Sequence, residues 1–523
     1  MKICLFFPSN LSDTEDKAQV NPPVGMVYVA SNLKRAGHEV KFFDCMLDHI
    51  KPEEYKEILL RENPDMIGVG FVSTLRYSGF EYARIAKETL PHAQVIVGGV
   101  HSSIFPKKIL QKYSFIDFVV SHEAEMSLLE LIEKGPVNTK GVTYRDEKGE
   151  IIKNPPSIPL TNLDELAMPD WNMCNMEKYY ETAKNFGADF LKFPHFGIIT
   201  SRGCPNRCTF CGSEKLSVKV RRHTPQYVHK MLKILRVKHN VRDIYFLDDT
   251  FALDLNWLNE LKTLLKENPI DIVFSGQIRA NTPPAVIKML KELGFYAVNI
   301  GVETGSQKVL NAMRKGIVVK QIKTCVKAAK ENGLFVKVYL IFGDLAEETD
   351  DIRQTVQLVN SLPIDEFVWG RMTFFPGTEL CTMRGIPDDW WFENNYMPLS
   401  EKFSTPIVNH AWFLLCVNNF FKQLRYKVKF NHKSWYKVAL KQLMIIGGLG
   451  IFISKIPFKT RFRDDIFAYM FLPLGYILTK TKLNDFILKT FLKIKYKRED
   501  SIYFTEDKNL LKNVPMPNAK PTN

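Results

Sequence analysis

TSRGCPNRCTFCG, the segment Thr200–Gly212, contains three cysteines in a C-x3-C-x2-C spacing, Cys204, Cys208 and Cys211. Thiolate is a soft ligand that suits iron–sulfur clusters and zinc. Three thiolates this close together can hold three irons of a [4Fe–4S] cluster. The fourth iron then has no protein ligand, so it is open to a molecule that reacts there.

Two other interpretations of the trio remain open. Three buried core cysteines are one, but Gly203 and Pro205 suit a binding loop better than a packed core. A structural zinc site is the other, and it usually needs a fourth protein ligand. The nearest candidate, His223, is twelve residues beyond Cys211.

The same segment resembles the cluster loop of the radical S-adenosylmethionine (SAM) enzymes. An apolar strand and TSRG precede CPNRCTFC, and the aromatic Phe210 stands just before the third cysteine. The resemblance implies that the open iron binds SAM and that an electron from the cluster cleaves it to a 5'-deoxyadenosyl radical. It also implies that Phe210 and Gly212 contact SAM, and that a flavodoxin or ferredoxin type of protein donates the electron.

Length and composition limit the number of domains, the cellular compartment and the kinds of partner. A chain of 523 residues with 45% hydrophobic residues is long enough for two to four globular domains. Its nine cysteines form no disulfide pattern outside the trio, which favours a reducing cytoplasm. The net charge of +14 permits contact with an anionic membrane surface or acidic ligands, and biased residue usage explains it equally well. No nucleic-acid-binding module is visible, so no nucleic acid is expected as a partner.

The first 145 residues predict a doubly wound, Rossmann-like sheet. Short apolar runs alternate with helical patterns, which is typical of parallel strands joined by helices. The expected strands are Ile3–Phe7, Val40–Phe43, Met66–Phe71, Gln94–Val97 and Phe115–Val120. The expected helices are Gly25–Arg35, Glu53–Arg61, Tyr77–Leu90 and Met126–Glu133. Ligands bind such sheets at the carboxyl ends of the strands.

Three stretches of this region resemble the cobalamin-binding domain found in one class of radical SAM enzymes. They are Pro22–Gly25 leading into Ala36–Val40, then Gly98–His101, then His122–Glu125, where the class more often has glycine at position 122. The chain has no D-x-H-x-x-G, so it lacks the motif that supplies a lower cobalt ligand in other cobalamin proteins. A domain that keeps the fold without cobalamin is the alternative. The resemblance implies cobalamin contacts from Gly98, Gly99, His101, Ser102 and Glu123.

A second α/β region follows a proline-rich linker. The predicted boundaries are 1–145 for the cobalamin-binding domain, 146–192 for the linker, 193–400 for the cluster domain and 401–523 for a mainly helical, basic domain. Six strands predict a partial (β/α)6 barrel whose reactive face lies at the strand carboxyl ends. They are Ile198–Thr200, Asp243–Leu247, Ile272–Gly276, Ala297–Gly301, Phe335–Phe342 and Glu366–Phe375.

The succession FLDDTF, GVETGSQKVL and FFPGTEL also resembles the radical SAM core. By resemblance and position, Arg279 and Glu303 are candidates for holding the carboxylate and ribose of SAM. The alternative is that these two residues pair with each other. Asp248 and Asp249 are candidates for contact with substrate or SAM, the alternative being two solvated acids. The family's G-x-P-G-E-T appears as Gly343–Thr349 without its Pro-Gly turn.

The tail is apolar and basic. His410–Phe430 predicts an amphipathic helix, and Leu440–Ser454 and Ile466–Thr479 are apolar stretches too short to span a membrane. They suit either an interfacial segment on an anionic membrane or a helical cap over the active site. The end, Asn509–Asn523, predicts disorder.

Together the two resemblances imply a cobalamin-dependent radical SAM enzyme, most of whose studied relatives are methyltransferases. The expected reaction is methyl transfer to an unactivated carbon of a small-molecule or lipid-like substrate. A cyclase or rearrangement enzyme of the same class is the first alternative. A non-catalytic iron–sulfur or electron-transfer protein is the second. The catalytic residues, the substrate and the lower cobalt ligand are not identified by the sequence.

Overall fold

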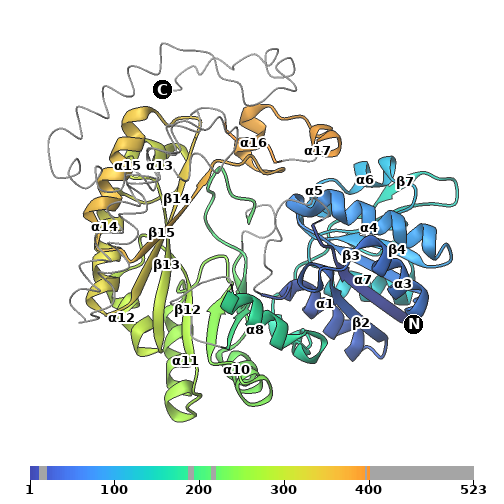
Figure 1. Ribbon diagram of the computed structural model, residues 1–523, viewed down its shortest axis with the longest axis horizontal. Helices are drawn as coiled ribbons and strands as arrows, with labels where there is room; N and C mark the ends of the chain where they lie inside the picture. The colour runs from blue at the N-terminus through green and yellow to red at the C-terminus, as the bar shows by residue number, and fades with distance from the viewer. Residues whose placement is uncertain (11–20, 186–193, 214–218, 395–396, 401–523) are drawn as a thin grey trace, which may run out of the picture.

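A computed structural model shows two α/β units side by side (Figure 1). It describes residues 1–10, 21–185, 194–213, 219–394 and 397–400. The predicted C-terminal domain, 401–523, with its expected helix and apolar stretches, lies outside these residues. The two predicted folds, a doubly wound N-terminal sheet and a partial barrel, are both confirmed.

The N-terminal sheet has the strand order β2-β1-β3-β4-β5-β6-β7 within the described residues. The first five strands are parallel and the last two antiparallel. The antiparallel pair was not predicted, and β7 lies beyond residue 145, so the sheet continues into the expected linker. The strands are β1 (Lys2–Phe7), β2 (Glu39–Asp44), β3 (Met66–Gly70), β4 (Gln94–Gly98), β5 (Phe118–Val120), β6 (Val142–Arg145) and β7 (Ile151–Lys153).

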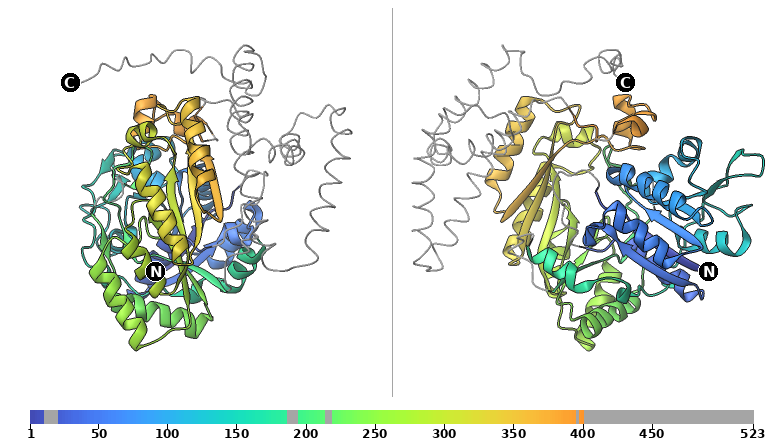
Figure 2. Two further views of the ribbon diagram at one scale, coloured as in Figure 1. Left: turned by 90° about the vertical axis from the view of Figure 1, so that its left-hand side faces the viewer. Right: turned by 45° about the vertical axis from the view of Figure 1, so that its right-hand side comes forward.

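Helices cover both faces of this sheet (Figures 1 and 2). Helices α1 (Val24–Arg35) and α7 (Ala124–Lys134) pack on one face, where Leu33 and Leu128 join a core with Ile3 and Ile96. Helices α3 (Pro52–Glu62) and α4 (Arg76–Thr89) pack on the other. Two short helices, α5 (Val100–Ile104) and α6 (Pro106–Lys112), follow β4. Parallel strands buried on both faces explain the continuous apolar runs in the sequence.

The second sheet is an open, parallel half-barrel. Its order within the described residues is β15-β14-β13-β12-β11-β8, so β8 and β15 form its edges. Its strands are β8 (His195–Ile198), β11 (Asp243–Phe246), β12 (Val273–Arg279), β13 (Phe295–Glu303), β14 (Phe335–Phe342) and β15 (Glu366–Arg371). Helices that follow the strands line its outer side, namely α10 (Pro225–His239), α11 (Leu255–Glu267), α12 (Pro284–Glu292), α14 (Val319–Glu331) and α15 (Thr349–Ser361) (Figure 1).

Two details at the start of this sheet differ from the prediction. Strand β8 is His195–Ile198, so it begins and ends earlier than the expected strand Ile198–Thr200 and shares only Ile198 with it. The chain then forms a small antiparallel hairpin in which β9 (Ser201–Arg202) pairs with β10 (Arg221–Arg222). A hairpin of two residues per strand leaves no periodic pattern in the sequence, which is why it was not predicted.

The segment after β15 returns to the N-terminal unit. It carries α16 (Glu379–Arg384) and α17 (Trp390–Glu393). Trp391 and Phe392 belong to the same buried cluster as Phe80 and Phe105 of the N-terminal unit. Figure 1 shows α17 beside α5. One apolar core therefore spans both units.

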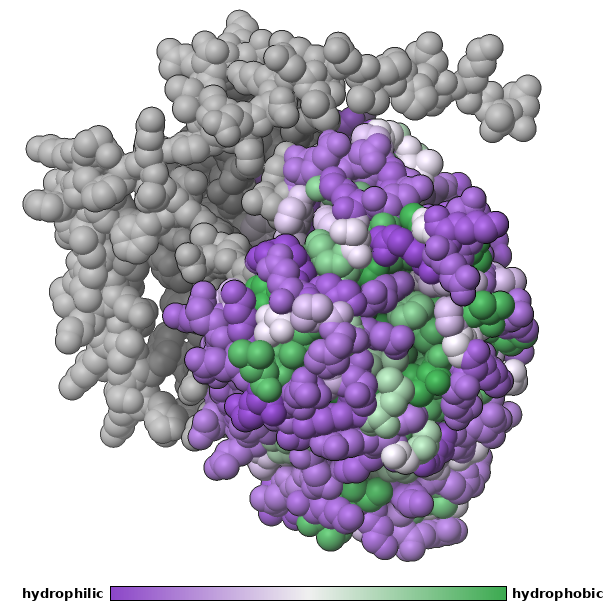
Figure 3. Space-filling model, turned by 90° about the vertical axis from the view of Figure 1, so that its right-hand side faces the viewer, coloured by the Kyte–Doolittle hydropathy of each residue, from purple (hydrophilic) through white to green (hydrophobic). Residues whose placement is uncertain are grey.

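The outward face of the N-terminal unit is mainly hydrophilic, with apolar side chains in small groups between polar ones (Figure 3). This mixture is ordinary for a solvated protein surface. The strand ends on the opposite side, toward the half-barrel, carry the features described next.

Candidate active site

The three cysteines of the trio lie on the loop that follows the hairpin strand β9. Cys204 and Cys208 have 9% and 7% of their surface exposed, and Cys211 is half-buried. Gly203, directly before the first cysteine, has a φ of +94°, a left-handed conformation that favours glycine. The turn into the cysteine loop therefore depends on this residue.

Two acids at the end of β11 hold this loop in place. The Asp248 carboxylate is 3% exposed and accepts hydrogen bonds from Thr200 N, Thr200 Oγ1 and Ser201 Oγ, each at 2.6 Å. Burial raises the pKa of Asp248, although these three donors oppose the shift. Asp249 is exposed and accepts from Gly203 N at 3.2 Å and Ser213 Oγ at 3.0 Å.

This arrangement corrects one alternative and leaves one prediction untested. Asp248 is buried and supports the loop backbone, so the interpretation of two solvated acids is wrong for this residue. Contact of Asp248 or Asp249 with substrate or SAM stays a prediction. The sequence placed both acids at a strand end but gave no sign that they hold the segment on either side of the cysteines.

Polar and cationic groups lie near two of the sulfurs. Cys204 Sγ lies 3.3 Å from Asn206 Nδ2 and 3.6 Å from Thr250 Oγ1. Burial raises the pKa of Cys208, and the neighbouring cations Lys315 and Arg279 oppose that shift. Cationic neighbours favour a thiolate, which is the form that binds iron.

Within the described part of the chain, no three His, Cys, Asp or Glu side chains converge on one metal-ion position. A [4Fe–4S] cluster does not require such convergence, because each cysteine binds a different iron. The three soft sulfurs on one loop, two of them buried, therefore fit a cluster.

A buried ion pair lies beside the cysteines, at the end of β13. Lys315 Nζ donates to Glu303 Oε1 at 2.5 Å, and each side chain is 8% exposed. Arg279 donates to the backbone oxygen of Lys315. The alternative in which Arg279 and Glu303 pair with each other is therefore wrong. Lys315 was missed by the sequence analysis because no motif marks it.

The backbone around Glu303 is unusual. Its φ is +62°, and the pairing of β13 with β14 shifts register between Gly301 and Glu303. A Cβ on Gly301 would lie 2.7 Å from Glu303 Oε1 and 3.1 Å from Lys315 Nζ. The ion pair therefore occupies the space that a side chain at position 301 would fill.

Three residues of the expected SAM site have surroundings that suit a bound amino acid group. Arg279 Nε is buried and has no hydrogen-bond partner among the described residues, so a donor remains for a carboxylate. Gly212 has no atom within 4 Å of the position that a Cβ would occupy. The Phe210 ring centroid lies 6.0 Å from Lys315 Nζ. The sites that Phe210, Gly212, Arg279 and Glu303 were predicted to form around SAM stay predictions, and their surroundings fit that ligand.

In the N-terminal unit the two glycines after β4 form a bare backbone edge. Gly99 is exposed and has a φ of +100°, and a Cβ there would lie 2.3 Å from the backbone oxygen of Phe71. Gly98 is half-buried, and its Cβ position lies 3.6 Å from Val120 O. An edge without side chains allows a flat ligand close approach, which fits the corrin ring of cobalamin.

Two residues of α5, His101 and Ser102, are buried behind this edge. His101 has no exposed surface; its Nδ1 lies 3.2 Å from Ser73 Oγ, and its Nε2 has no partner among the described residues. Burial, with a smaller effect of Arg76, lowers the pKa of His101 to about 3, so the ring is neutral. Ser102 is also buried and donates to Gly98 O at 3.2 Å. Their predicted contact with cobalamin stays a prediction.

Glu123, the remaining predicted cobalamin residue, lies in a joint between the two units. Arg221 Nη1 donates to Glu123 Oε2 at 2.9 Å, and Arg202 Nη1 lies 3.4 Å from the same oxygen. Burial would raise the pKa of Glu123, but the hydrogen bond from Arg221 and the nearby arginine charges lower it overall. Arg202 also pairs with Glu125 at 2.5 Å.

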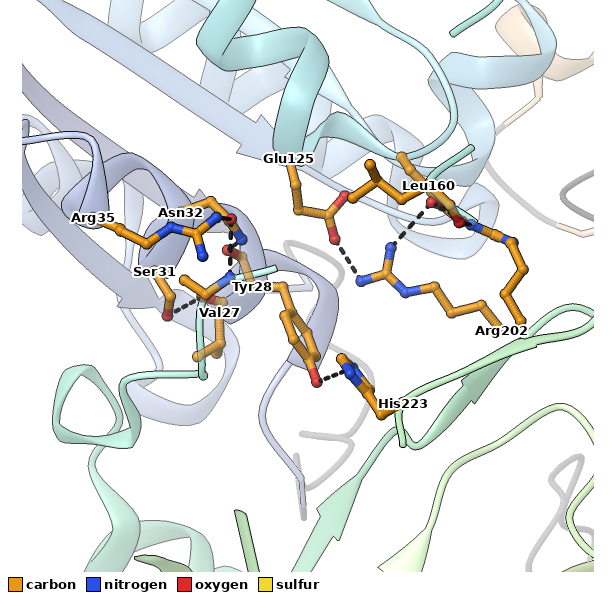
Figure 4. A network of polar contacts seen from close by, with 12 residues as sticks. Val27, Tyr28, Ser31, Asn32, Arg35, Glu125, Leu160, Arg202 and His223 are labelled. Carbon is orange, nitrogen blue, oxygen red and sulfur yellow. Dashed lines mark hydrogen bonds and ion pairs between the residues drawn. The ribbon is translucent and has the colours of Figure 1, made fainter. Parts of the chain in front are cut away.

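A second set of contacts completes this joint (Figure 4). The Tyr28 hydroxyl of α1 lies 2.9 Å from His223 Nε2, and His223 Nδ1 lies 2.9 Å from Asp164 Oδ1. The Arg202 guanidinium lies 5.2 Å from the centre of the Tyr28 ring. The helix after β1, the loop after β5 and the hairpin before the cysteines are thus joined.

The carboxyl edges of the two sheets face each other. Besides the joint just described, the loop after β4 meets the loop after β15, because Ile104 Cδ1 lies 3.5 Å from the Cβ position of Gly377. Phe210, on the cysteine loop, packs against the core shared by both units. The cysteine loop and the Gly98-Gly99 edge therefore open toward the same region.

Comparison with known proteins gives two family matches. Residues 198–359 match the Radical SAM superfamily, and residues 17–132 match the B12 binding domain. Among curated proteins, the uncharacterized methyltransferase PH0819 of Pyrococcus horikoshii is 30% identical over 388 residues, which is 73% of this chain and 82% of that protein. An anaerobic magnesium-protoporphyrin IX monomethyl ester cyclase of Rubrivivax gelatinosus is 24% identical over 73% of this chain and 69% of its own length.

A solved structure has the same architecture. The cobalamin-dependent S-adenosylmethionine radical enzyme OxsB, with aqua-cobalamin bound, superposes with a TM-score of 0.67 at 18% identity and covers 94% of this chain and 75% of its own. At this identity the likeness concerns the fold. It agrees with the order of domains found here.

Proposed function

Because this chain belongs to the cobalamin-dependent radical SAM enzymes, we propose that it transfers a methyl group to an unactivated carbon of a small molecule. Its cofactors are a [4Fe–4S] cluster, SAM and cobalamin. The facing carboxyl edges carry the proposal, because methyl transfer needs the cobalamin and the SAM sites to open on one shared substrate.

We propose cofactor contacts for residues of both units. Cys204, Cys208 and Cys211 would hold the cluster; Phe210, Gly212, Arg279 and Glu303 would hold SAM; Gly98 and Gly99 would lie against the corrin. When bound, the cluster and SAM supply a reagent that removes hydrogen from carbon, and cobalamin supplies the methyl carrier.

The chain itself orients these groups and keeps water away. Buried Asp248 fixes Thr200 and Ser201 just before the cysteines. The Lys315–Glu303 ion pair, whose side chains are each 8% exposed, keeps two opposite charges away from solvent beside Cys208. A low-dielectric site strengthens the hold of such groups on a charged ligand.

The first alternative is a cyclase or rearrangement of the same class, and the relative from Rubrivivax gelatinosus bears a cyclase name. Methyl transfer adds one CH2 to the product, whereas a rearrangement adds none. The second alternative, a protein without enzymatic activity, is not supported by the relatives.

The test combines anaerobic reconstitution with labelled SAM. The chain is purified without oxygen, loaded with iron, sulfide and hydroxocobalamin, and given a reductant and SAM with a deuterated methyl group. Fractions of a cell extract are added as the source of substrate. We expect 5'-deoxyadenosine, and a product heavier by the labelled methyl. Release of 5'-deoxyadenosine with no labelled product from any cell fraction would contradict methyl transfer and favour the alternative.

Cys208→Ala is the matched loss-of-function variant. It removes one of three cluster ligands, so we expect loss of cluster absorbance and at least a hundredfold loss of SAM cleavage. Cys381→Ala is the control, because this buried cysteine lies on α16 and outside the trio. Equal loss in both variants would contradict the assignment of the trio.

We make further proposals about the electron donor, the cellular location and contact with a membrane. The reaction needs an external reductant, and we propose a flavodoxin or ferredoxin in a reducing cytoplasm. Among the described residues no helix is both long and apolar enough to cross a membrane. Vesicle binding of the full chain tests contact of the tail with a membrane surface.

A further inference from the structure

The inner face of the half-barrel is polar, whereas its outer face is apolar. Outward-facing residues such as Phe274, Val298 and Val338 belong to the core under the helices. Ala297 of β13 and Ile341 of β14 are apolar at the alternate positions of these strands, but the other alternate positions near the middle of the sheet carry hydrogen-bonding side chains. These are Tyr245 of β11, Ser275 and Gln277 of β12, Asn299 of β13, and Lys337 and Tyr339 of β14.

Three of these side chains form a bridge across the sheet. Asn299 Nδ2 donates to Tyr245 Oη at 3.0 Å and to Tyr339 Oη at 3.2 Å. Strand β12 lies between Tyr245 and Asn299, so the bridge passes over its Ser275 and Gln277. Such a contact is possible only if all these side chains lie on one face.

Two groups on this face have unused hydrogen-bonding capacity. Gln277 is exposed although it lies on a central strand, and its side chain has no hydrogen bond among the described residues. Ser275 Oγ is buried and also lacks a partner there. A parallel strand normally buries apolar side chains on both faces. A buried polar group without a partner costs stability, so the Ser275 hydroxyl needs another explanation, and the exposed Gln277 amide beside it is free to bind a ligand.

The polar face continues directly to the proposed SAM site. Gln277 is two residues before Arg279 on β12, and Asn299 is two residues before Gly301 on β13, so all four lie on the inner face. The face carries little free charge, since Lys337 pairs with Glu366 at 3.0 Å. It therefore offers mainly neutral donors and acceptors.

We propose that Tyr245, Gln277, Asn299 and Tyr339 form the floor of the substrate site and select a polar, uncharged substrate. The substrate presents hydroxyl, amide or carbonyl groups to this floor, and a hydrocarbon lipid is excluded because it would leave the floor unpaired. This inference rests on the proposed function, which requires a substrate beside SAM, and it makes the substrate class specific.

The test uses the holoenzyme and two cell extracts. Cells that contain the protein naturally are extracted with water and with an organic solvent. Each fraction is added to the reconstituted enzyme with SAM and reductant, and the increase in 5'-deoxyadenosine release is measured. We expect only the aqueous fraction to increase it. Stimulation by the organic fraction, or by neither, overturns the inference.

Two variants test whether the floor residues are responsible for the stimulated release of 5'-deoxyadenosine. Gln277→Leu and Asn299→Leu replace hydrogen-bonding groups with apolar ones, and we expect each to lower the stimulation about tenfold. Gln94→Leu, at an exposed position at the start of β4, is the matched control and should keep it. Iron content, cobalamin content and melting temperature show that each variant is folded. Folded floor variants with full stimulation overturn the inference.

The measurements distinguish a failure of the methyltransferase proposal from a failure of the polar-floor proposal. Stimulated release of 5'-deoxyadenosine without transfer of the labelled methyl contradicts the methyltransferase and leaves the polar floor supported. Labelled methyl found only in the organic fraction contradicts the floor and leaves the methyltransferase supported.

Discussion

His223 is a residue whose charge state governs the joint between the two units. It is 1% exposed, stacks on Tyr227 with ring centroids 4.1 Å apart, and touches Tyr28 and Asp164 through its two nitrogens. Burial lowers its pKa to about 4, even though Asp164 opposes this shift. The neutral ring is therefore the form that the folded joint requires.

The pH dependence follows from that shift. The unfolded ring has a pKa near 6.5, so the folded state binds fewer protons between pH 6.5 and 4. The contribution of this group to the free energy of unfolding is full above pH 6.5 and falls as the pH drops through 4, by up to about 3 kcal/mol, because folding lowers the pKa from 6.5 to about 4. Urea unfolding at several pH values measures it.

His101, with a pKa of about 3, contributes in the same direction. His223→Gln should therefore reduce the pH slope and not abolish it. A slope unchanged in this variant would contradict the assignment.

Gly301 is a residue where one methyl group should disturb SAM binding. Its Cβ position lies 2.7 Å from Glu303 Oε1, so Gly301→Ala displaces the ion pair with Lys315. We expect a loss of about 1–3 kcal/mol in stability and at least tenfold weaker SAM binding. Equilibrium binding of SAM to the reconstituted enzyme measures the second effect. Gly25→Ala is the control, since its Cβ position has no atom within 4 Å and its φ is not in the left-handed region. If Gly301→Ala binds SAM as tightly as Gly25→Ala does, the prediction is contradicted.

At the scale of elements, the short hairpin β9–β10 makes ion pairs with the N-terminal unit. Arg202 of β9 stands two residues before Cys204 and pairs with Glu125 of α7. Arg221 of β10 pairs with Glu123. The hairpin thus connects the cysteine loop to the end of β5 in the N-terminal unit. Its arginines set where the loop lies relative to the glycine edge after β4.

A double-mutant cycle tests this connection. Arg202→Ala, Glu125→Ala and the double variant should give a coupling energy of about 1–3 kcal/mol, because both side chains are largely buried. We also expect more 5'-deoxyadenosine released per product formed in the single variants, since the loop loses its position. Arg222→Ala is the control, as its contact with Asp254 is within the barrel unit. Additive stability effects of the two substitutions would contradict the coupling.

The same elements show what the sequence could and could not predict. Long apolar runs at regular spacing predicted the parallel strands, because each buries a continuous stripe. The cysteine trio was found because its three ligands are close in sequence. Lys315, Arg202 and Arg221 were missed because their partners are 12, 77 and 98 residues away. Contacts at such separations depend on the tertiary fold and leave no local pattern.

At the scale of the whole molecule, the two units share one core. Val309, Met372 and Phe374 of the barrel unit belong to the same buried cluster as Phe6 and Phe71 of the N-terminal unit. The domain boundary predicted from the sequence therefore separates the two sheets. It does not separate two independent hydrophobic cores, because one core contains residues of both units. Arg76 secures this junction from the start of α4: it is 1% exposed, and its Nε donates to Trp391 O at 2.9 Å.

A shared core predicts cooperative unfolding. We expect the wild-type chain to show a single urea transition by tryptophan fluorescence and by far-ultraviolet circular dichroism. Arg76→Ala leaves Trp391 O and Asn394 O without their donor, which should cost about 3 kcal/mol and separate the transition into two. Arg84→Ala on the same helix is the control, because its partners Glu81 and Glu88 are partly exposed. Two transitions in the wild type, or an Arg76 variant that unfolds like the Arg84 variant, would show that the units fold independently and that the junction does not hold the two carboxyl edges together.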